Sequence, residues 1–267
     1  GKSTLLKTFL GFLKPAAGGG RVLGFDIATQ AMQIRQVVGY MPEQDCHIPG
    51  MSAVEFVSYA GELSGMPTAQ AIRRAHEVIE YCGLGEARYR MMETYSTGMK
   101  QRIKLAQALV HGPKLLLLDE PTNGLDPRGR EDMLDLVRSV SHGKGVSVLV
   151  SSHLLKDIER TCDQVIVVAR ATLPAQGPIR DLKQIQGEPL DLEVKEMLPG
   201  FPAAMKELGL NVIGVAGAKA RVTGPGTRGE NTRVVFAAAR QSGVQIRSIA
   251  PAERSLEEAF LEVVAHG

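Results

Sequence analysis

The chain lacks tryptophan, holds only three cysteines in 267 residues and carries almost no excess charge. Cys46, Cys82 and Cys162 are odd in number and form no CxxC or metal-binding spacing, which indicates reduced thiols in a cytosolic protein. A formal net charge of +2 argues against a protein that coats nucleic acid. No apolar run approaches the roughly 20 residues of a membrane-spanning helix, so any association with a membrane must pass through a partner or a surface.

One stretch, residues 95–126, organises the rest of the chain; it reads YSTGMKQRIKLAQALVHGPKLLLLDEPTNGLD. Residues 115–118 are wholly apolar, which predicts a strand buried on both faces. This strand ends in Asp119 and Glu120, at the edge of a parallel sheet where open α/β folds bind ligands. Two adjacent acids indicate a metal ligand beside a base that activates water. The alternative is a strand end that simply meets solvent.

The first four residues, Gly1-Lys2-Ser3-Thr4, match the end of the phosphate-binding pattern G-x-x-x-x-G-K-[ST]. Backbone N–H groups at the start of a helix would hold phosphate oxygens there. Lys2 would add a cation beside the terminal phosphates, and the Ser3 hydroxyl would ligate magnesium. Followed by a helical pattern and much later by LLLLDEP, these residues predict a nucleotide site.

These motifs, taken in order, resemble the ATP-binding subunit of an ATP-binding-cassette (ABC) transporter over residues 1 to about 180. YSTGMKQR stands where that family has its signature, GLDP at 124–127 resembles its D-loop, and SSH at 151–153 resembles its switch-histidine loop. Tyr95, Thr97 and Met99 depart from the commonest signature. Similar departures occur in subunits of drug, lipid or polysaccharide exporters.

The resemblance implies ATP hydrolysis with Mg²⁺ between two protomers. Lys2 would offset phosphate charge, and Ser3 and Asp119 would hold the metal. Glu120 would orient and deprotonate the attacking water, and His153 would support the γ-phosphate. Phosphoryl transfer consists mainly of positioning and charge stabilisation, so this set suffices. The resemblance completes the nucleotide-contacting set with Gly1, Thr4, Glu43, Gln44, Ser96, Gly98 and Asp126.

Two parts of this set keep alternatives: the glutamine loop and Asp126. The family's glutamine loop usually places glutamine directly after proline; here Glu43 holds that place and Gln44 follows, so Glu43 is slightly favoured and Gln44 stays open. Ser96 and Gly98 lie at the start of a helix predicted over 98–111, where a serine hydroxyl and glycine N–H groups make an anion site aided by the helix dipole. Asp126 is followed by proline and fits a helix cap; the resemblance adds a contact across the dimer.

The fold predicted is α/β: a P-loop NTPase parallel sheet flanked by helices over residues 1–185, with an all-helical insert at about 45–112. The order β-α-β-β-α-β over 186–267 predicts a small ferredoxin-like α+β domain. That domain has a regulatory or dimer-supporting role, or is a stabilising appendage. The first helix is expected to run through residues 5–13.

Local signals predict further helix boundaries. Ser52-x-x-Glu55 and the stretch from Ser255 to Glu258 are capping boxes, each at the start of a helix. Another helix is predicted over 178–185. Lys100 and Arg102 are interpreted as solvated or dipole-pairing charges.

Because the chain starts inside the phosphate loop, we expect an N-terminal truncation. The family's preceding strand would lie between strands predicted at 146–150 and 164–168, so both would keep unpaired edges. We therefore expect this chain alone to be poorly stable and not to hydrolyse ATP.

The predicted function is that of an ATPase subunit that powers export by a membrane-spanning permease, at the cytoplasmic face of the cell membrane. A second ATP-binding subunit, identical or different, would complete it, with no nucleic-acid partner. Two alternatives remain: a soluble cassette ATPase acting on ribosomes or DNA, and an inactive truncated fragment.

Overall fold

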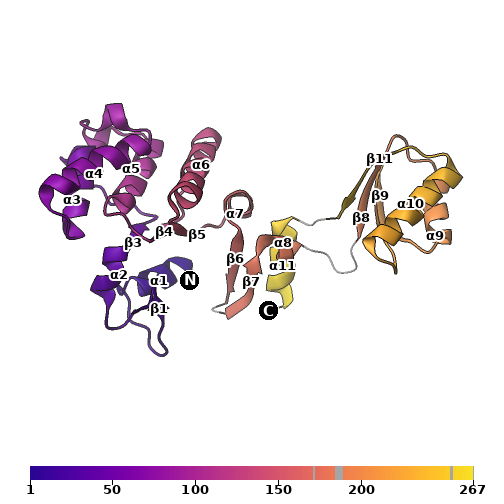
Figure 1. Cartoon of the computed structure of the whole chain (residues 1–267), viewed down its shortest axis with the longest axis horizontal. Helices are drawn as coiled ribbons and strands as arrows, with labels where there is room; N and C mark the ends of the chain where they lie inside the picture. Colours follow the sequence, from indigo (N-terminus) through magenta and orange to yellow (C-terminus); the bar gives the residue numbers. More distant parts are fainter. Residues whose placement is uncertain (171, 184–188, 253–254, 267) are drawn as a thin grey trace. The chain divides into compact units, whose positions relative to one another are not determined.

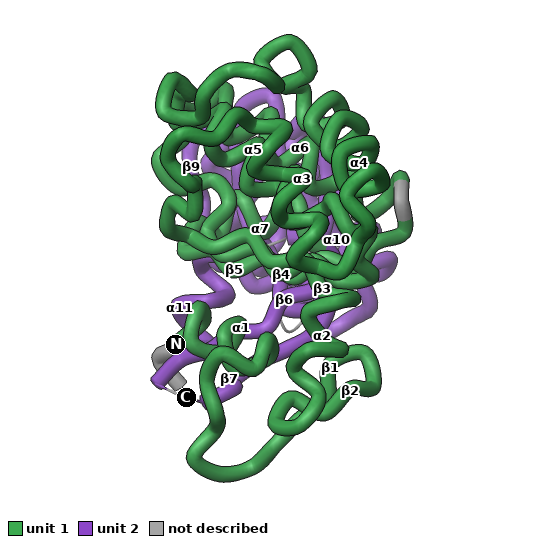
Figure 2. The backbone as a smooth tube through the Cα atoms, turned by 90° about the vertical axis from the view of Figure 1, so that its left-hand side faces the viewer, with its two compact units in different colours: residues 1–162 green, residues 163–267 purple. Residues whose placement is uncertain are grey.

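The computed structural model describes residues 1–170, 172–183, 189–252 and 255–266 (Figure 1). They form two compact units, Gly1–Cys162 and Asp163–Gly267, coloured separately in Figure 2. This division differs from the predicted boundary between residues 185 and 186. That boundary lies outside the described residues, so it stays a prediction.

A parallel sheet forms the centre of the first unit, in the order β3 (Val38–Met41), β4 (Leu115–Asp119) and β5 (Ser147–Ser151). Strand β4 is buried on both faces, as its apolar run predicts. Leu116 and Leu118 pack into one apolar cluster, and Leu117 packs into another on the opposite side. The alternation of side chains along a strand thus places a separate core on each face of the sheet.

One face carries the predicted helical insert. It comprises α3 (Ala53–Leu63), α4 (Thr68–Tyr81), two short 3-10 turns (Gly85–Ala87 and Met92–Thr94) and α5 (Thr97–Leu109). The predicted capping box of Ser52 and Glu55 opens α3. A Cβ atom on Gly39 of β3 would lie 2.1 Å from the carbonyl oxygen of Ala108, so α5 approaches β3 too closely for any side chain there.

The opposite face carries α1 (Lys2–Phe9), the short strands β1 (Arg21–Val22) and β2 (Phe25–Asp26), and α2 (Ala31–Val37). Helix α1 is shorter than the prediction of residues 5–13. Gly11 adopts φ +72°, a left-handed conformation that ends helices and that glycine takes without strain. The predicted extension of α1 to residue 13 was therefore wrong.

Two further helices belong to the first unit: α6 (Pro127–Lys144), which ends at the left-handed Gly145, and α7 (Leu155–Thr161). Strand β5 pairs with β4 and, within the described residues, with no other strand. One edge of the sheet therefore ends at β5.

The second unit begins with a hairpin of β6 (Gln164–Ala169) and β7 (Thr172–Pro178), followed by α8 (Ile179–Lys183). Residues 184 and 185 of the helix predicted over 178–185 lie outside the described part. The last helix, α11 (Leu256–His266), contacts α8 and β7. It begins at the predicted capping box of Ser255 and Glu258.

The second unit also contains the predicted ferredoxin-like sheet, in the order β11-β8-β10-β9 with every neighbouring pair antiparallel. Its elements are β8 (Leu190–Val194), α9 (Gly200–Glu207), β9 (Asn211–Ala216), β10 (Lys219–Thr223), α10 (Arg228–Ser242) and β11 (Ile246–Pro251). The β-α-β-β-α-β prediction is confirmed. Across the described residues, no helix has the length and apolar character needed to cross a bilayer.

Candidate functional site

Three distant segments meet at the carboxyl end of β4, around the side chain of Glu120. Its Oε2 lies 2.8 Å from Nδ1 of His153, whose backbone N–H also donates to Oε2 at 3.4 Å. Its Oε1 lies 3.7 Å from Nζ of Lys2, at the start of α1. The Glu120 side chain is 9% exposed, whereas those of Lys2 and His153 are 45% and 60% exposed. The carboxylate is therefore buried behind two side chains that a ligand can reach.

The backbone of Glu120 is strained, because this non-glycine residue adopts φ +50°. Its N–H donates to the carbonyl oxygen of Ser151 at 2.8 Å, which continues the pairing of β4 with β5 and fixes this geometry. A left-handed conformation in a non-glycine residue costs of order 1–3 kcal/mol, and such residues cluster at functional sites.

Asp119 is 2% exposed, and its Oδ1 has no hydrogen-bond partner. The Oγ of Ser151, its register neighbour on β5, is also buried without a partner. A buried polar atom without a partner is rare in folded proteins and calls for a ligand or a water. A carboxylate oxygen and the Ser3 hydroxyl are ligands of the kind that Mg²⁺ prefers.

The described residues contain no group of three His, Cys, Asp or Glu side chains able to hold a metal. Mg²⁺ is usually bound by one or two protein groups together with substrate phosphates. The buried Oδ1 of Asp119, which has no partner, and the Ser3 hydroxyl have the chemistry of such groups.

The remaining residues of the predicted phosphate loop lie at the start of α1. Gly1 is its N-cap and accepts the N–H of Leu5 at 3.0 Å. Ser3 is half-buried, and Thr4 is exposed. The free N–H groups of this first turn are the donors that the predicted phosphate site requires.

The loop after β3 distinguishes Glu43 from Gln44. Both side chains are exposed, but Oε1 of Glu43 accepts a hydrogen bond from Nδ2 of Asn123 at 3.3 Å. Asn123 in turn donates its backbone N–H to the carbonyl of Glu120 at 3.1 Å. Burial, followed by the charges of Asp119 and Glu43, raises the pKa of the Tyr40 hydroxyl. Glu43 thus hydrogen-bonds to the loop that follows Glu120. Which of Glu43 and Gln44 contacts the nucleotide stays a prediction.

Ser96 and Gly98 stand at the exposed start of α5. The Oγ of Ser96 accepts the N–H of Met99 at 3.3 Å, so Ser96 is the cap of this helix. No hydrogen bond or ion pair found in the described part of the chain joins Ser96 to Lys2, Glu120 or His153. A phosphate role for Ser96 stays a prediction.

Asp126 caps α6 as predicted: its Oδ1 accepts the N–H of Gly129 at 2.8 Å, and proline occupies the first helical position. The contact across a dimer stays a prediction. Arg102, expected to be solvated or to pair with the helix dipole, instead bonds Asp132 of α6 at 2.9 Å.

Sequence reasoning missed several polar residues behind the site. Gln101, Lys104 and Gln107 of α5 each donate to backbone carbonyls of β3 or of neighbouring loops. Thr122 donates to the buried carboxylate of Asp157 at 2.8 Å. A signal existed for the α5 residues, because long polar side chains recur at every third position of an otherwise apolar helix face.

A family model described as ABC transporter matches residues 1–123. The daunorubicin/doxorubicin resistance ATP-binding protein DrrA of Streptomyces peucetius is 31% identical over 275 aligned positions, which cover 100% of this chain and 81% of that protein. The chain belongs to the ABC transporter ATP-binding proteins. The P-loop ATPase fold predicted from the motifs follows from this membership.

Two solved structures agree with this ABC membership. The ATP-binding subunit of an ABC transporter superposes with a TM-score of 0.60 at 27% identity, over 68% of this chain and 75% of that one. The protein cbiO1 of Clostridium perfringens, part of the ABC transporter complex cbiONQ, gives 0.60 at 26% identity, over 68% and 78%.

The chain spans only part of some curated ABC relatives. The uncharacterized ABC transporter ATP-binding protein YxlF of Bacillus subtilis is 40% identical over 202 residues, which are 75% of this chain and 66% of YxlF. YdbJ of the same organism is 36% identical over 69% of this chain and 59% of its own length.

Proposed function

We propose that this ABC ATP-binding protein hydrolyses ATP to power export by a membrane-spanning permease. The observation that carries the proposal is the convergence of Lys2 and His153 on the buried carboxylate of Glu120, beside the unpartnered Oδ1 of Asp119. This arrangement supplies a base, a cation and a metal ligand at the carboxyl end of β4.

Each side chain has a physical task in this proposal. Glu120 accepts a proton from the water that attacks the γ-phosphorus, and the bond to ADP breaks to release phosphate. His153 holds the Glu120 carboxylate at 2.8 Å and extends to solvent where the γ-phosphate binds. Lys2 offsets charge on the β- and γ-phosphates. Mg²⁺, held by Ser3, Asp119 and the nucleotide, neutralises further phosphate charge.

A second ATP-binding subunit, identical or different, completes the site. Ser96 and Gly98 at the exposed start of α5 offer a hydroxyl, backbone N–H groups and a positive helix end to the γ-phosphate of ATP held by that partner. The exposure of Ser96 supports this role. Asp126, also exposed, contacts the partner subunit while capping α6.

The permease partner places the protein at the cytoplasmic face of the cell membrane. The drug-resistance name of DrrA supports export, and the assignment of cbiO1 to a transporter complex supports a permease. No observation on the described residues favours the alternative, a soluble ATPase acting on ribosomes or DNA.

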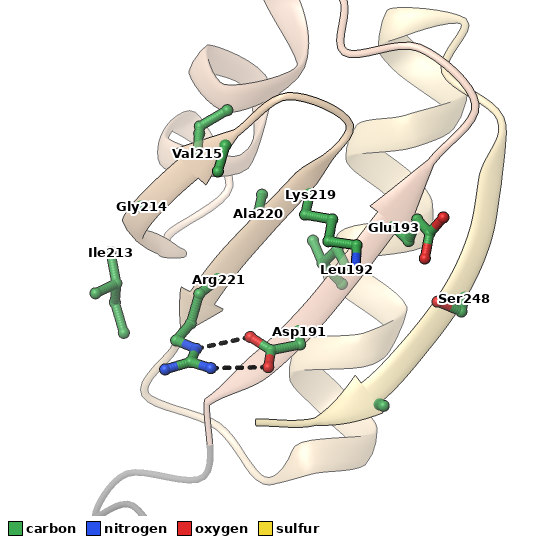
Figure 3. A pocket seen from close by; sticks show the side chains of 12 residues that line it. Asp191, Leu192, Glu193, Ile213, Gly214, Val215, Lys219, Ala220, Arg221 and Ser248 are labelled. Carbon is green, nitrogen blue, oxygen red and sulfur yellow. Dashed lines mark hydrogen bonds and ion pairs between the residues drawn. The ribbon is translucent and has the colours of Figure 1, made fainter. Parts of the chain in front are cut away.

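The ferredoxin-like domain has a regulatory or dimer-supporting role in this proposal. The sheet presents a hollow of about 570 Å³, lined by β8, β9, β10 and β11 (Figure 3). Arg221 crosses part of this face to bind both oxygens of Asp191, at 2.7 and 2.9 Å. The hollow contains none of the predicted nucleotide-site residues.

The experiment is Glu120→Gln in the full-length protein. Loss of a general base lowers turnover by about 10²- to 10⁴-fold, while Mg²⁺-ATP binding persists and traps an ATP-bound dimer visible by light scattering. Glu131→Gln, at an exposed position of α6, is the matched control and should keep normal turnover. Wild-type turnover in Glu120→Gln would refute the base assignment. Absence of Mg²⁺-ATP affinity in the unaltered protein would refute the proposed function.

A further inference from the structure

Lys104 is completely buried in α5, although lysine is one of the residues least often buried. Its Nζ donates to the carbonyl oxygens of three consecutive residues: Pro42 at 2.8 Å, Glu43 at 2.9 Å and Gln44 at 3.4 Å. An ammonium group has three donors. One loop therefore satisfies the whole hydrogen-bonding capacity of this buried charge.

These bonds determine the shape of the loop after β3. Successive carbonyls of an extended chain point in alternate directions, so three that converge on one atom require a tightly curved backbone. The side chains of Glu43 and Gln44 are exposed and do not anchor the loop in a core. The Lys104 ammonium therefore holds the conformation of residues 42–44.

The same loop is connected to the candidate site. Glu43 accepts a hydrogen bond from Asn123 at 3.3 Å, and Asn123 donates its N–H to the carbonyl of Glu120. The carbonyl of Asn123 accepts Nε2 of Gln101, one turn before Lys104 on α5, at 2.9 Å. Helix α5, the loop after β3 and the loop after β4 thus form a closed circuit of hydrogen bonds.

We propose that Lys104 is a positioning residue for ATP hydrolysis: it holds residues 42–44 so that Glu43 faces the loop after Glu120. It also couples that loop to α5, the helix capped by Ser96. This rests on the proposed function, because the orientation of Glu43 serves a reaction only if the site holds ATP. Lys104 itself touches neither nucleotide nor metal.

Lys104→Met tests the proposal, since methionine keeps an apolar stem of similar length and removes all three donors. Lys100→Met is the matched control: it lies one turn earlier on α5, and its only ion pair in the described structure is a 3.9 Å contact with Asp45. Exposed pairs of this kind contribute little.

The first measurement is cleavage of the 267-residue chain by a glutamate-specific protease, which needs no nucleotide. The bond after Glu43 lies in the loop that Lys104 holds, and a protease cuts such a bond when the loop opens. Lys104→Met should raise the rate of cleavage after Glu43 by about tenfold or more and leave the rates at other glutamates unchanged, because the opening is local. Lys100→Met should leave all the rates unchanged. An unchanged rate after Glu43 in Lys104→Met would overturn the proposal. Faster cleavage at glutamates throughout the first unit would do so too, because it would show a purely structural residue.

The second measurement is ATP turnover by the full-length protein. Lys104→Met should lower kcat by about tenfold and leave KM for ATP within about twofold, the split expected when transition-state positioning alone is lost. A loop that is cleaved faster while kcat stays unchanged would refute the role in the reaction. If the unaltered protein hydrolyses no ATP, the proposed function fails and the positioning role fails with it, while the cleavage result still decides whether Lys104 holds the loop.

Discussion

Replacing Glu120 by glycine should give a more stable protein than replacing it by alanine. Both variants lose the same carboxylate, so the lost bond to His153 and the lost ion pair with Lys2 cancel in the comparison. What differs is the backbone at φ +50°. A left-handed conformation costs an L-residue roughly 1–2 kcal/mol, and glycine pays nothing.

Glycine also has an opposite effect on stability, because it loses more conformational entropy on folding than alanine does. At ordinary positions this destabilises a glycine variant by roughly 0.5–1 kcal/mol relative to the alanine variant. The difference between the two costs lies between about 0 and 1.5 kcal/mol, so Glu120→Gly should be more stable than Glu120→Ala by about 0.75 kcal/mol. The control pair is Arg138→Gly and Arg138→Ala, on the exposed side of α6, where the order should reverse.

Urea unfolding followed by circular dichroism measures these differences, and the absence of tryptophan makes fluorescence a poorer probe. If Glu120→Ala proves as stable as Glu120→Gly while the Arg138 pair behaves normally, the strain at residue 120 is not imposed by the pairing of β4 with β5. The argument from strain to function would then be refuted.

Two further predictions concern other parts of the first unit. Gly39→Ala should lower the free energy of unfolding in urea by about 1–3 kcal/mol, because the new Cβ would lie 2.1 Å from the backbone of α5. Gly143→Ala is the control and should not destabilise the unit, because its Cβ would meet nothing within 4 Å. Equal effects of the two substitutions would contradict the close approach of α5 to Gly39. The Ser52 side chain, followed by its backbone N–H, lowers the pKa of Glu55. The capping box therefore stabilises the fold at neutral pH and loses this effect as pH falls below about 4.3, the ordinary glutamate pKa. The stability gap between wild type and Glu55→Ala should stay constant from pH 7 to about pH 5 and narrow as pH falls from about 4.3 to about 3. A gap that stays constant down to about pH 3 would argue against the linkage.

Local chemistry made much of this architecture predictable. The capping boxes at Ser52 and Ser255 and the cap at Asp126 depend on residues within one helical turn, and all three occur in the structure. The apolar run of β4 and the ferredoxin-like order likewise follow from patterning along the chain. The predicted end of α1 was wrong because Gly11, which adopts a left-handed conformation, was not interpreted as the end of the helix.

The convergence on Glu120 was anticipated through a resemblance, because single motifs carry no distances. The features that characterise the site arise between residues far apart in the chain. The left-handed backbone of Glu120 depends on Ser151, and the three bonds of Lys104 reach residues 60 to 62 positions away. The spacing of Gln101, Lys104 and Gln107 on α5 marks a polar row, but it does not say which segment of the chain these side chains reach.

Elements whose stability comes from neighbours within a few positions can therefore be predicted from the sequence, as the helix caps and β4 were. The burial of a side chain and the identity of its hydrogen-bond partners cannot, because they depend on which segments the folded chain brings together. The unpartnered oxygen of Asp119, the burial of Lys104 and the choice of Glu43 over Gln44 as the side chain facing Asn123 all belong to this second kind. The burial of Lys104 and its bonds to the loop of Glu43 need the close packing of α5 against β3, where a Cβ atom on residue 39 would lie 2.1 Å from the carbonyl oxygen of Ala108.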